Sequence, residues 1–195
     1  MDLSVLKLPQ NKMEKFWDKG IFTIEDLVYF FPKKYLDFRN AKNIKDIAHG
    51  EICAVIGKIE DISEGTNYIR VKVRDNKNWF MYIFWFNMKY IKKMIKKGEE
   101  YIFCGRVYID EKYNVRTMTN PIKFGKDKEK LLTIHTIYPK INGISEEYLK
   151  KCIQNGLALI EKKDYLENHL ITKFGLISKG EALRIIHNPK NEEEY

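Results

Sequence analysis

The stretch "NYIRVKVRDNKNWFMYIFWF", residues 67–86, contains two strand patterns separated by a polar turn. In its first half, apolar and charged residues alternate strictly, which is typical of a half-buried β-strand. The apolar members of this alternation are Ile69, Val71 and Val73. The second half, residues 78–86, is apolar on both faces, and Asn76 with Lys77 suits the turn between the halves. The stretch therefore predicts two consecutive strands joined by a turn.

Three more strands are predicted on either side of this stretch. Residues 51–63 form a β-branched run that contains Gly57, and a glycine inside a strand indicates a bulge or a sharp coil. Residues 99–110 and 113–120 read as a hairpin across a turn at Glu111 and Lys112.

A lysine-rich amphipathic helix is predicted over residues 88–97, between the third and fourth strands. Ile91, Met94 and Ile95 form its apolar stripe, and Gly98 ends it. Three strands, one helix and two strands is the order of an OB-fold, a five-stranded barrel that commonly binds oligonucleotides. The expected fold class is therefore mainly β with flanking α, a five-stranded OB-fold barrel between N-terminal and C-terminal helical segments.

Helix signals flank the predicted barrel on both sides. Thr23 suits the N-cap of a helix near the N-terminus, Ser145 that of a longer helix after the barrel, and Ser178 with Glu181 the capping box of a last helix. The expected segments are an N-terminal helical segment, the barrel domain and a C-terminal helical connector. Their boundaries are 1–48, 49–125 and 126–195.

The composition favours a binding module with a polyanionic partner. The chain has 195 residues and a net charge of +8, which suits nucleic acid or an anionic membrane surface. No phosphate-loop sequence is present, since Gly125-Lys126-Asp127 lacks both the first glycine and the hydroxyl that binds magnesium. The chain also lacks Cys-x-x-Cys, His-Glu-x-x-His and Gly-x-Ser-x-Gly. We therefore expect no catalytic site, no metal and no cofactor in this chain.

The cysteines and the apolar runs indicate a cytoplasmic protein. Cys53, Cys104 and Cys152 are an odd number of widely spaced thiols, which indicates buried cysteines in a reducing compartment. No secretory signal is recognised at the N-terminus, and no apolar run reaches the length of a membrane span. We expect no membrane association.

Four stretches resemble the N-terminal region of RecG-type DNA helicases. They are "IFTIEDLVYFFPKKYLDF" (21–38), "FWFNMKYIKKMIKKGEEYIFCGRV" (84–107), "IHTIYPKINGISEEYLKKCI" (134–153) and "SKGEALRIIHNPKNEEEY" (178–195). In that family this region is the wedge domain, an OB-fold at the branch point of forked DNA, and two motor domains that use ATP and magnesium follow it. The resemblance implies a monomer that acts on forked or Holliday-junction DNA in replication-fork remodelling, repair and recombination. It also implies an excised piece of an ATP-dependent helicase whose motor domains are its partners in the same polypeptide; a free-standing wedge protein is the alternative.

The resemblance also places the functional residues. The family's stacking pair falls on Phe86 and Tyr90, and stacking on unpaired bases suits a protein that acts at any sequence. Cations of the second strand and of the lysine-rich helix, with two arginines further on, are expected to contact phosphates. These residues are Arg70, Lys72, Arg74, Lys89, Lys92, Lys93, Arg106 and Arg116.

Two departures from the family pattern and several alternatives accompany this interpretation. Residues 7–16 contain no glycine where the family has a glycine-rich turn, and Met88 stands where glutamine is usual. Phe86 could instead close the barrel core, with Tyr90 packed on the helix. A general single-stranded nucleic-acid-binding module without junction preference, or a protein-interaction domain, would also fit the charge and the aromatic residues.

Overall fold

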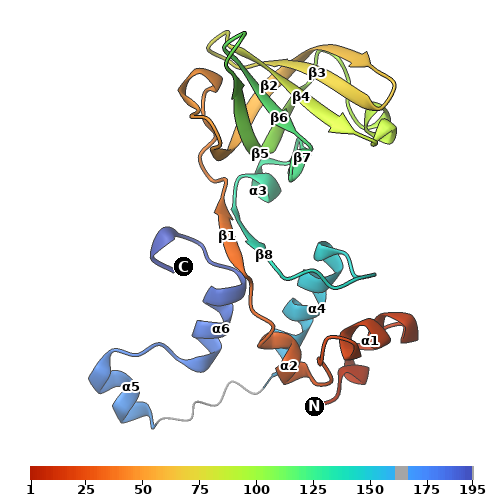
Figure 1. Cartoon of the computed structure of the whole chain (residues 1–195). Coiled ribbons are helices and arrows are strands. Elements are labelled where there is room, and N and C mark those ends of the chain that lie inside the picture. The colour runs from red at the N-terminus through yellow and green to blue at the C-terminus, as the bar shows by residue number, and fades with distance from the viewer. Residues whose placement is uncertain (161–166, 195) are drawn as a thin grey trace. The chain divides into compact units, whose positions relative to one another are not determined.

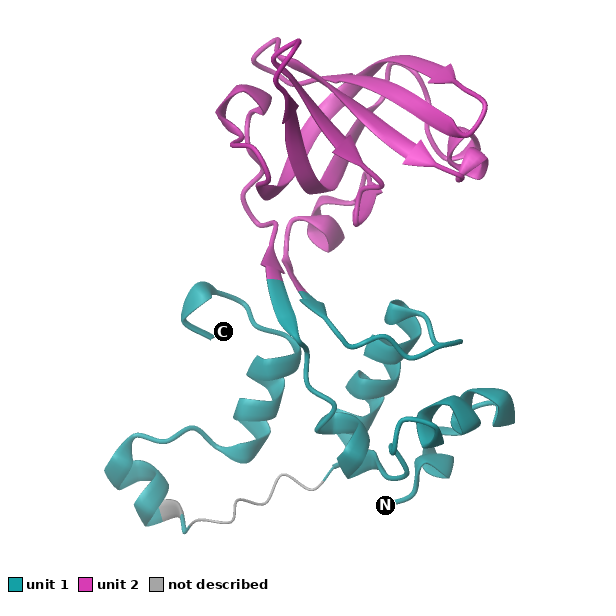
Figure 2. Ribbon diagram, viewed as in Figure 1, with its two compact units in different colours: residues 1–35, 136–195 teal, residues 36–135 magenta. Residues whose placement is uncertain are grey.

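The protein consists of two compact units (Figure 2). The computed structural model describes residues 1–160 and 167–194. Unit 1 contains Met1–Tyr35 and Thr136–Tyr195, and unit 2 contains Leu36–His135. The contacts therefore group the two helical ends of the chain in one unit, whereas the sequence analysis divided the chain into three consecutive segments.

Unit 2 is a closed five-stranded barrel with the strand order of an OB-fold (Figure 1). Its strands are β2 (Ile52–Glu64), β3 (Tyr68–Arg74), β4 (Phe80–Phe86), β5 (Glu100–Asp110) and β6 (Val115–Thr119). The order is β2-β3-β4-β6-β5, and β2 also pairs with β5, which closes the barrel. The β4–β6 pair is parallel and the other pairs are antiparallel. All five predicted strands and the OB-fold are confirmed.

Three short strands were not predicted. β7 (Lys123–Gly125) pairs with β5, while β1 (Lys34–Asp37) and β8 (Ile134–Ile137) form a separate two-stranded sheet. Each has only three or four residues. Such a length is too short for a period-two pattern to show in the sequence. A short helix, α3 (Lys128–Leu131), lies between β7 and β8, and a 3₁₀ turn, η2 (Ile44–Asp46), precedes β2.

The barrel closes because β2 changes its pairing partner at Lys58, directly after Gly57. Its first half pairs with β5 from Ile52 to Lys58, and its second half pairs with β3 from Lys58 onward. A Cβ atom on Gly57 would lie 2.9 Å from the carbonyl oxygen of Arg74 and 2.3 Å from the Val73 side chain. The absence of a side chain therefore lets β2 coil tightly against β3, as predicted. The bulge itself lies three residues later, at Glu60.

The predicted helix over residues 88–97 is wrong in type and length. The segment is a 3₁₀ helix, η3, of only five residues, Lys89–Lys93. Met88 occupies its N-cap and offers no side-chain hydrogen bond, and successive lysines repel one another along the segment. Ile91 and Ile95 are buried as predicted, but the Met94 side chain is 56% exposed. Two anchoring side chains and no cap are too little to stabilise a helix of three turns.

Unit 1 is helical. The helices of this unit are η1 (Leu3–Leu6), α1 (Gln10–Trp17), α2 (Ile24–Val28), α4 (Glu146–Leu159), α5 (Asn168–Phe174), α6 (Lys179–His187) and η4 (Glu192–Glu194). Three of them, α2, α4 and α6, begin directly after the N-caps that the sequence predicts. Thr23 and Asp26 form a capping box at α2. Ser145 accepts a hydrogen bond from the Tyr148 N–H at α4, and Ser178 accepts one from the Glu181 N–H at α6. These caps satisfy N–H groups that have no partner inside a helix.

His187 ties three segments of unit 1 together. Its Nε2 lies 2.7 Å from the carbonyl oxygen of Val28, and its Nδ1 lies 2.7 Å from the Tyr138 hydroxyl. Because a carbonyl can only accept, Nε2 carries the hydrogen and Tyr138 donates to Nδ1. Burial lowers the pKa of His187 and raises that of Tyr138 to about 12. The neutral imidazole is thus a fixed part of this core.

Candidate nucleic-acid interface

The β3–β4 hairpin separates its side chains into an inner and an outer set. The inner set fills the barrel core, and each of its members is at most 1% exposed. It consists of Ile69, Val71, Val73, Met81, Ile83 and Trp85. Every outer side chain retains some exposure. The alternation predicted for the first strand is confirmed, and the second strand follows the same rule although its outer residues are apolar.

The outer side of β4 is a column of aromatic rings, hereafter the ring column. It consists of Phe80, Tyr82, Phe84 and Phe86. The centroids of successive rings lie 5.8, 6.4 and 6.1 Å apart. Phe84 and Phe86 are nearly parallel, with an angle of 13° between their planes. The column is therefore a continuous aromatic ladder along one strand.

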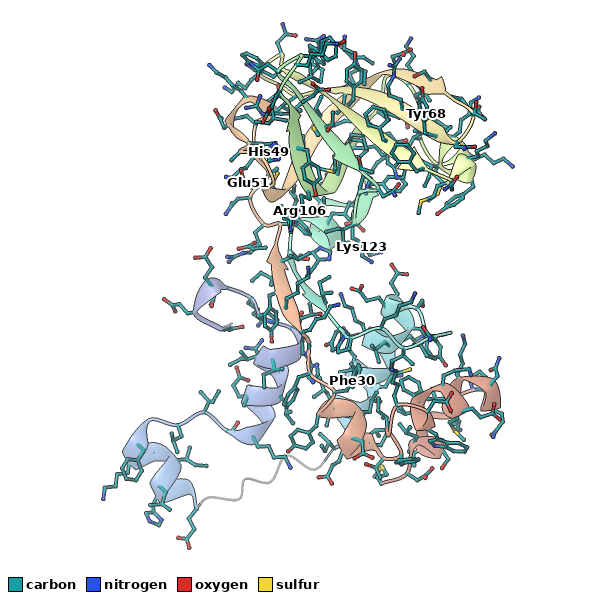
Figure 3. The ribbon with its side chains drawn as sticks, viewed as in Figure 1. Phe30, His49, Glu51, Tyr68, Arg106 and Lys123 are labelled. Carbon is teal, nitrogen blue, oxygen red and sulfur yellow. The ribbon has the colours of Figure 1, made fainter. Side chains whose placement is uncertain are left out.

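The outer side of β3 is a column of cations beside these rings, hereafter the cation column. It consists of Arg70, Lys72 and Arg74, and it faces Phe84, Tyr82 and Phe80 across the ladder. The Arg70 guanidinium lies 5.3 Å from the centre of the Tyr82 ring, and the Lys72 ammonium lies 4.6 Å from that of Phe80. These distances are typical of cation–π contacts. Tyr68 begins the same strand face, opposite Phe86 (Figure 3).

Phe86 and Tyr90 both lie at the surface, where β4 ends and η3 begins. The Phe86 side chain is 43% exposed and that of Tyr90 is 59% exposed. This exposure rules out the alternative in which Phe86 closes the barrel core. Asn87 turns the chain after β4 with a φ of 56°, and Asn120 fixes the strand end by accepting a hydrogen bond of 2.9 Å from the Phe86 N–H. The two rings thus follow one another around a tightly held strand end.

Glutamates of β2 hold several of the expected phosphate-binding cations. Glu60 forms ion pairs with Arg74 and, at 3.3 Å, with Lys72. Glu64 pairs with Lys92 at 2.9 Å and with Lys89 at 3.9 Å. The hydrogen bond from Arg74 lowers the pKa of Glu60, and that from Lys92 lowers the pKa of Glu64. Both carboxylates are therefore ionised at neutral pH and offset part of the positive charge.

Two of the expected phosphate contacts lie elsewhere and bind backbone carbonyls. Arg116 donates to the carbonyl oxygens of Ile47 at 3.0 Å and Lys45 at 2.5 Å. Arg106 donates to the carbonyl oxygen of Gly50, and Figure 3 shows it well away from Tyr68. Both guanidinium groups thus fasten the loop before β2. The structure does not bring these two arginines together with the cation column. Lys93, the remaining expected phosphate contact, is exposed on η3, two residues before the buried Ile95.

The rest of the described chain offers little other chemistry. Within residues 1–160 and 167–194, no cluster of three or more His, Cys, Asp or Glu side chains is placed to hold a metal ion. Burial raises the pKa of Cys53 and Cys152 to about 11 and that of Cys104 to about 12, so these thiols are protonated and unreactive. No helix in the described part of the chain is long and apolar enough to cross a membrane.

The sequence analysis missed two features of this surface. The rings at 80, 82 and 84 were described only as apolar residues of a strand, although their spacing of two residues places them on one face. The second feature is the ion pairing of Glu60, which lies at the bulge of β2, with Lys72 and Arg74 of the neighbouring strand β3. The first feature was visible in the pattern, whereas the second required the register of the strands.

The comparisons with known proteins agree on one family. The model of the RecG wedge domain matches residues 7–160. The ATP-dependent DNA helicase RecG of Thermotoga maritima is 26% identical over 188 residues, which cover 92% of this chain and 24% of that protein. RecG of Synechocystis sp. is 24% identical over 217 residues, which cover 98% of this chain and 26% of that protein. The chain therefore spans about a quarter of the length of these relatives.

The fold also matches a solved structure. The "Structure of RecG bound to three-way DNA junction" is similar with a TM-score of 0.81 and 24% sequence identity. The match covers 100% of this chain and 28% of that one. At this identity the similarity supports the same fold for the chain.

Proposed function

The chain belongs to the RecG wedge domain family, and from this membership we propose that it binds forked or branched DNA at the branch point. The observation that carries the proposal is the pair of exposed rings, Phe86 and Tyr90, around the end of β4. An exposed ring can stack on the face of a base that has lost its partner, at about 1–3 kcal/mol per base and without sequence preference. Two such rings suit a wedge between separating strands.

The cations near these rings would hold the phosphates of the branch. Lys89, Lys92 and Lys93 follow the strand end on η3, and Arg70 lies on the neighbouring strand face. Contacts to phosphates position a protein on DNA without reading the sequence. We propose that these residues orient the branch against the two rings, and that the cations held by a glutamate contribute less. Glu60 holds Lys72 and Arg74, and Glu64 holds Lys89 and Lys92.

The proposal extends to the helicase activity of a longer protein of which this chain would be one part. The similar proteins from Thermotoga maritima and Synechocystis are ATP-dependent DNA helicases that this chain covers only in part. We propose that the wedge acts with helicase motor domains of the same polypeptide, which would bind ATP and magnesium, in fork remodelling, recombination and repair in the cytoplasm. The chain itself is proposed to act as a monomeric binding module.

The test is a fluorescence-anisotropy titration of the chain against three DNAs of equal length, a fork, a linear duplex and a single strand, at two salt concentrations. Preference for the fork at both salt concentrations is the expected result, because only the fork offers unpaired bases beside duplex phosphates. Equal affinity for all three DNAs would contradict the proposal and leave a general basic binder. Binding to none of them would favour a protein-interaction domain.

A further inference from the structure

The 3₁₀ segment η3 has three different sides, because its side chains repeat every three residues. Residues three apart in a 3₁₀ helix lie one above the other. Ile91 is 2% exposed and marks the side that packs against the barrel core. The second side carries Lys89 and Lys92, and the third side carries Tyr90 and Lys93. The ring that is proposed to stack on a base therefore shares its side with one lysine and not with the other two.

A single carboxylate holds the second side. Glu64 is the last residue of β2, and its Oε2 lies 2.9 Å from the ammonium of Lys92. Its Oε1 lies 3.9 Å from the ammonium of Lys89. Each carboxylate oxygen thus faces one lysine, which is possible because the 3₁₀ repeat aligns the two side chains.

The third side is left free by these contacts. The Tyr90 ring is 59% exposed, and Lys93 is exposed as well. Among the residues that the structure describes, Lys93 forms no ion pair. A phosphate can therefore bind Lys93 without breaking an internal ion pair, whereas at Lys89 or Lys92 it must compete with Glu64.

The two ends of this segment are fastened by different contacts. Beyond its C-terminal end, the Tyr101 hydroxyl accepts a hydrogen bond of 3.1 Å from the Lys96 N–H. At the N-terminal end, where Tyr90 lies, the N-cap residue Met88 offers no side-chain hydrogen bond. The ion pairs of Glu64 supply a link between this end and the neighbouring strand.

We propose that Glu64 is a positioning residue for branch recognition, which holds η3 in the rotation that turns Tyr90 and Lys93 outward together. The core contact of Ile91 and the ion pairs lie on two sides of η3, and together they fix the direction of the third side. A ring beside a free cation suits an unpaired base and its phosphate. The inference rests on the proposed function and adds a determinant of specificity to it. Because it holds two lysines, Glu64 weakens binding to phosphates in general and strengthens selection of the branch.

The test measures the affinity of the whole chain for a fork and for a linear duplex by fluorescence anisotropy, at two salt concentrations. Glu64→Gln keeps the size of the side chain and removes its charge. We expect the ratio of fork to duplex affinity to fall about threefold, which is the size of effect that exposed ion pairs produce. Affinity for the duplex should rise at the same time. Its salt dependence should steepen by as much as about 0.9 for each released lysine.

Glu60→Gln is the matched control. Glu60 also holds two cations, Lys72 and Arg74, but both lie on β3. The variant therefore makes the same change in net charge and releases the same number of cations without altering the contacts of η3. Its affinities for the fork and the duplex should rise by the same factor, so that their ratio stays at the wild-type value.

The exchanged pair Glu64→Lys/Lys92→Glu tests the contact itself. It places opposite charges across the same gap and keeps the net charge of wild type. The ratio of fork to duplex affinity should return to the wild-type value. The thermal melting of each variant shows that the barrel is folded.

The possible outcomes separate this inference from the proposed function. If folded Glu64→Gln keeps the wild-type ratio, or if Glu60→Gln lowers the ratio equally, Glu64 acts through net charge and the inference alone is wrong. An exchanged pair that leaves the ratio as low as in Glu64→Gln would also overturn it. If wild type itself shows no preference for the fork, the proposed function fails and the inference fails with it.

Discussion

Trp85 and Phe86 are neighbours in the chain and lie on opposite sides of the barrel wall. The Trp85 side chain is 1% exposed, and its ring centroid lies 5.3 Å from that of Phe124. The Phe86 side chain, by contrast, is 43% exposed. The same contrast holds along the whole β3–β4 hairpin, with aliphatic residues and Trp85 inside and rings with cations outside. One hairpin thus fills the barrel core with one face and presents rings and cations at the surface with the other.

The largest effect is expected from the inner face. Trp85→Ala should lower the free energy of unfolding by about 3–5 kcal/mol, because a large buried side chain leaves a cavity. Urea denaturation measures the loss of stability. The variant should lose fork binding over the same range of urea concentration in which it unfolds. A loss below about 1 kcal/mol would contradict the assignment of Trp85 to the core.

A smaller loss of stability is expected from Arg116. Arg116→Gln should lower the free energy of unfolding by about 1–3 kcal/mol, because the carbonyl groups of Ile47 and Lys45 lose a charged donor. Its fork binding at a temperature well below the melting point should keep the salt dependence of wild type. A shallower salt dependence at unchanged stability would instead make Arg116 a phosphate contact, as the sequence analysis expected.

The outer face should show its own pH dependence through Glu60. The pKa of Glu60 is lowered in the folded protein, so its ion pairs stabilise the fold above the ordinary carboxyl pKa of 4.5. This contribution is lost as the pH falls below 4.5 and through the lowered pKa of the folded state. Glu60→Gln should therefore flatten the decline of stability with acid. Identical acid profiles for the variant and wild type would contradict a stabilising role for these pairs.

The smallest effect is expected from an exposed lysine of η3. Lys93→Gln should change the free energy of unfolding by less than about 0.5 kcal/mol, as exposed substitutions do. It should make the salt dependence of fork binding shallower by about 0.9, the contribution of one phosphate contact on duplex DNA. Lys19→Gln, in unit 1, is the control and should leave both quantities unchanged. If both lysine variants shift the salt slope equally, the effect comes from net charge and not from position.

The barrel could be predicted because apolar and charged residues alternate along the second strand, and this alternation corresponds to the inner and outer faces of the barrel in the structure. Ile69, Val71 and Val73 are buried as their spacing requires, and Gly57 lies where β2 coils. The prediction of a lysine-rich helix was wrong because it relied on the spacing of the apolar residues alone. It did not consider that Met88 cannot cap the helix with its side chain. Strand register also decides which charges meet, so the ion pairs of Glu60 could not be predicted from the sequence.

The candidate site was predictable in its residues but only partly in its arrangement. Phe86 and Tyr90 came from the family pattern, and their exposure agrees with a surface role. In the sequence, Arg106 and Arg116 could not be told apart from the other arginines. Only the structure shows that their guanidinium groups donate hydrogen bonds to backbone carbonyl oxygens. Residue type indicates positive charge, whereas the available partners decide whether that charge is free to bind DNA.

The most direct test of the account compares stability and branch recognition in one variant. Phe86→Ala/Tyr90→Ala removes the outer rings beside an intact core, and its urea midpoint and its ratio of fork to linear-duplex affinity are measured together. The account predicts an unchanged midpoint and a ratio that falls by about tenfold or more, since stacking contributes at each ring. A midpoint lowered as far as in Trp85→Ala, with the fork preference retained, would show that these rings serve the fold and would contradict the account.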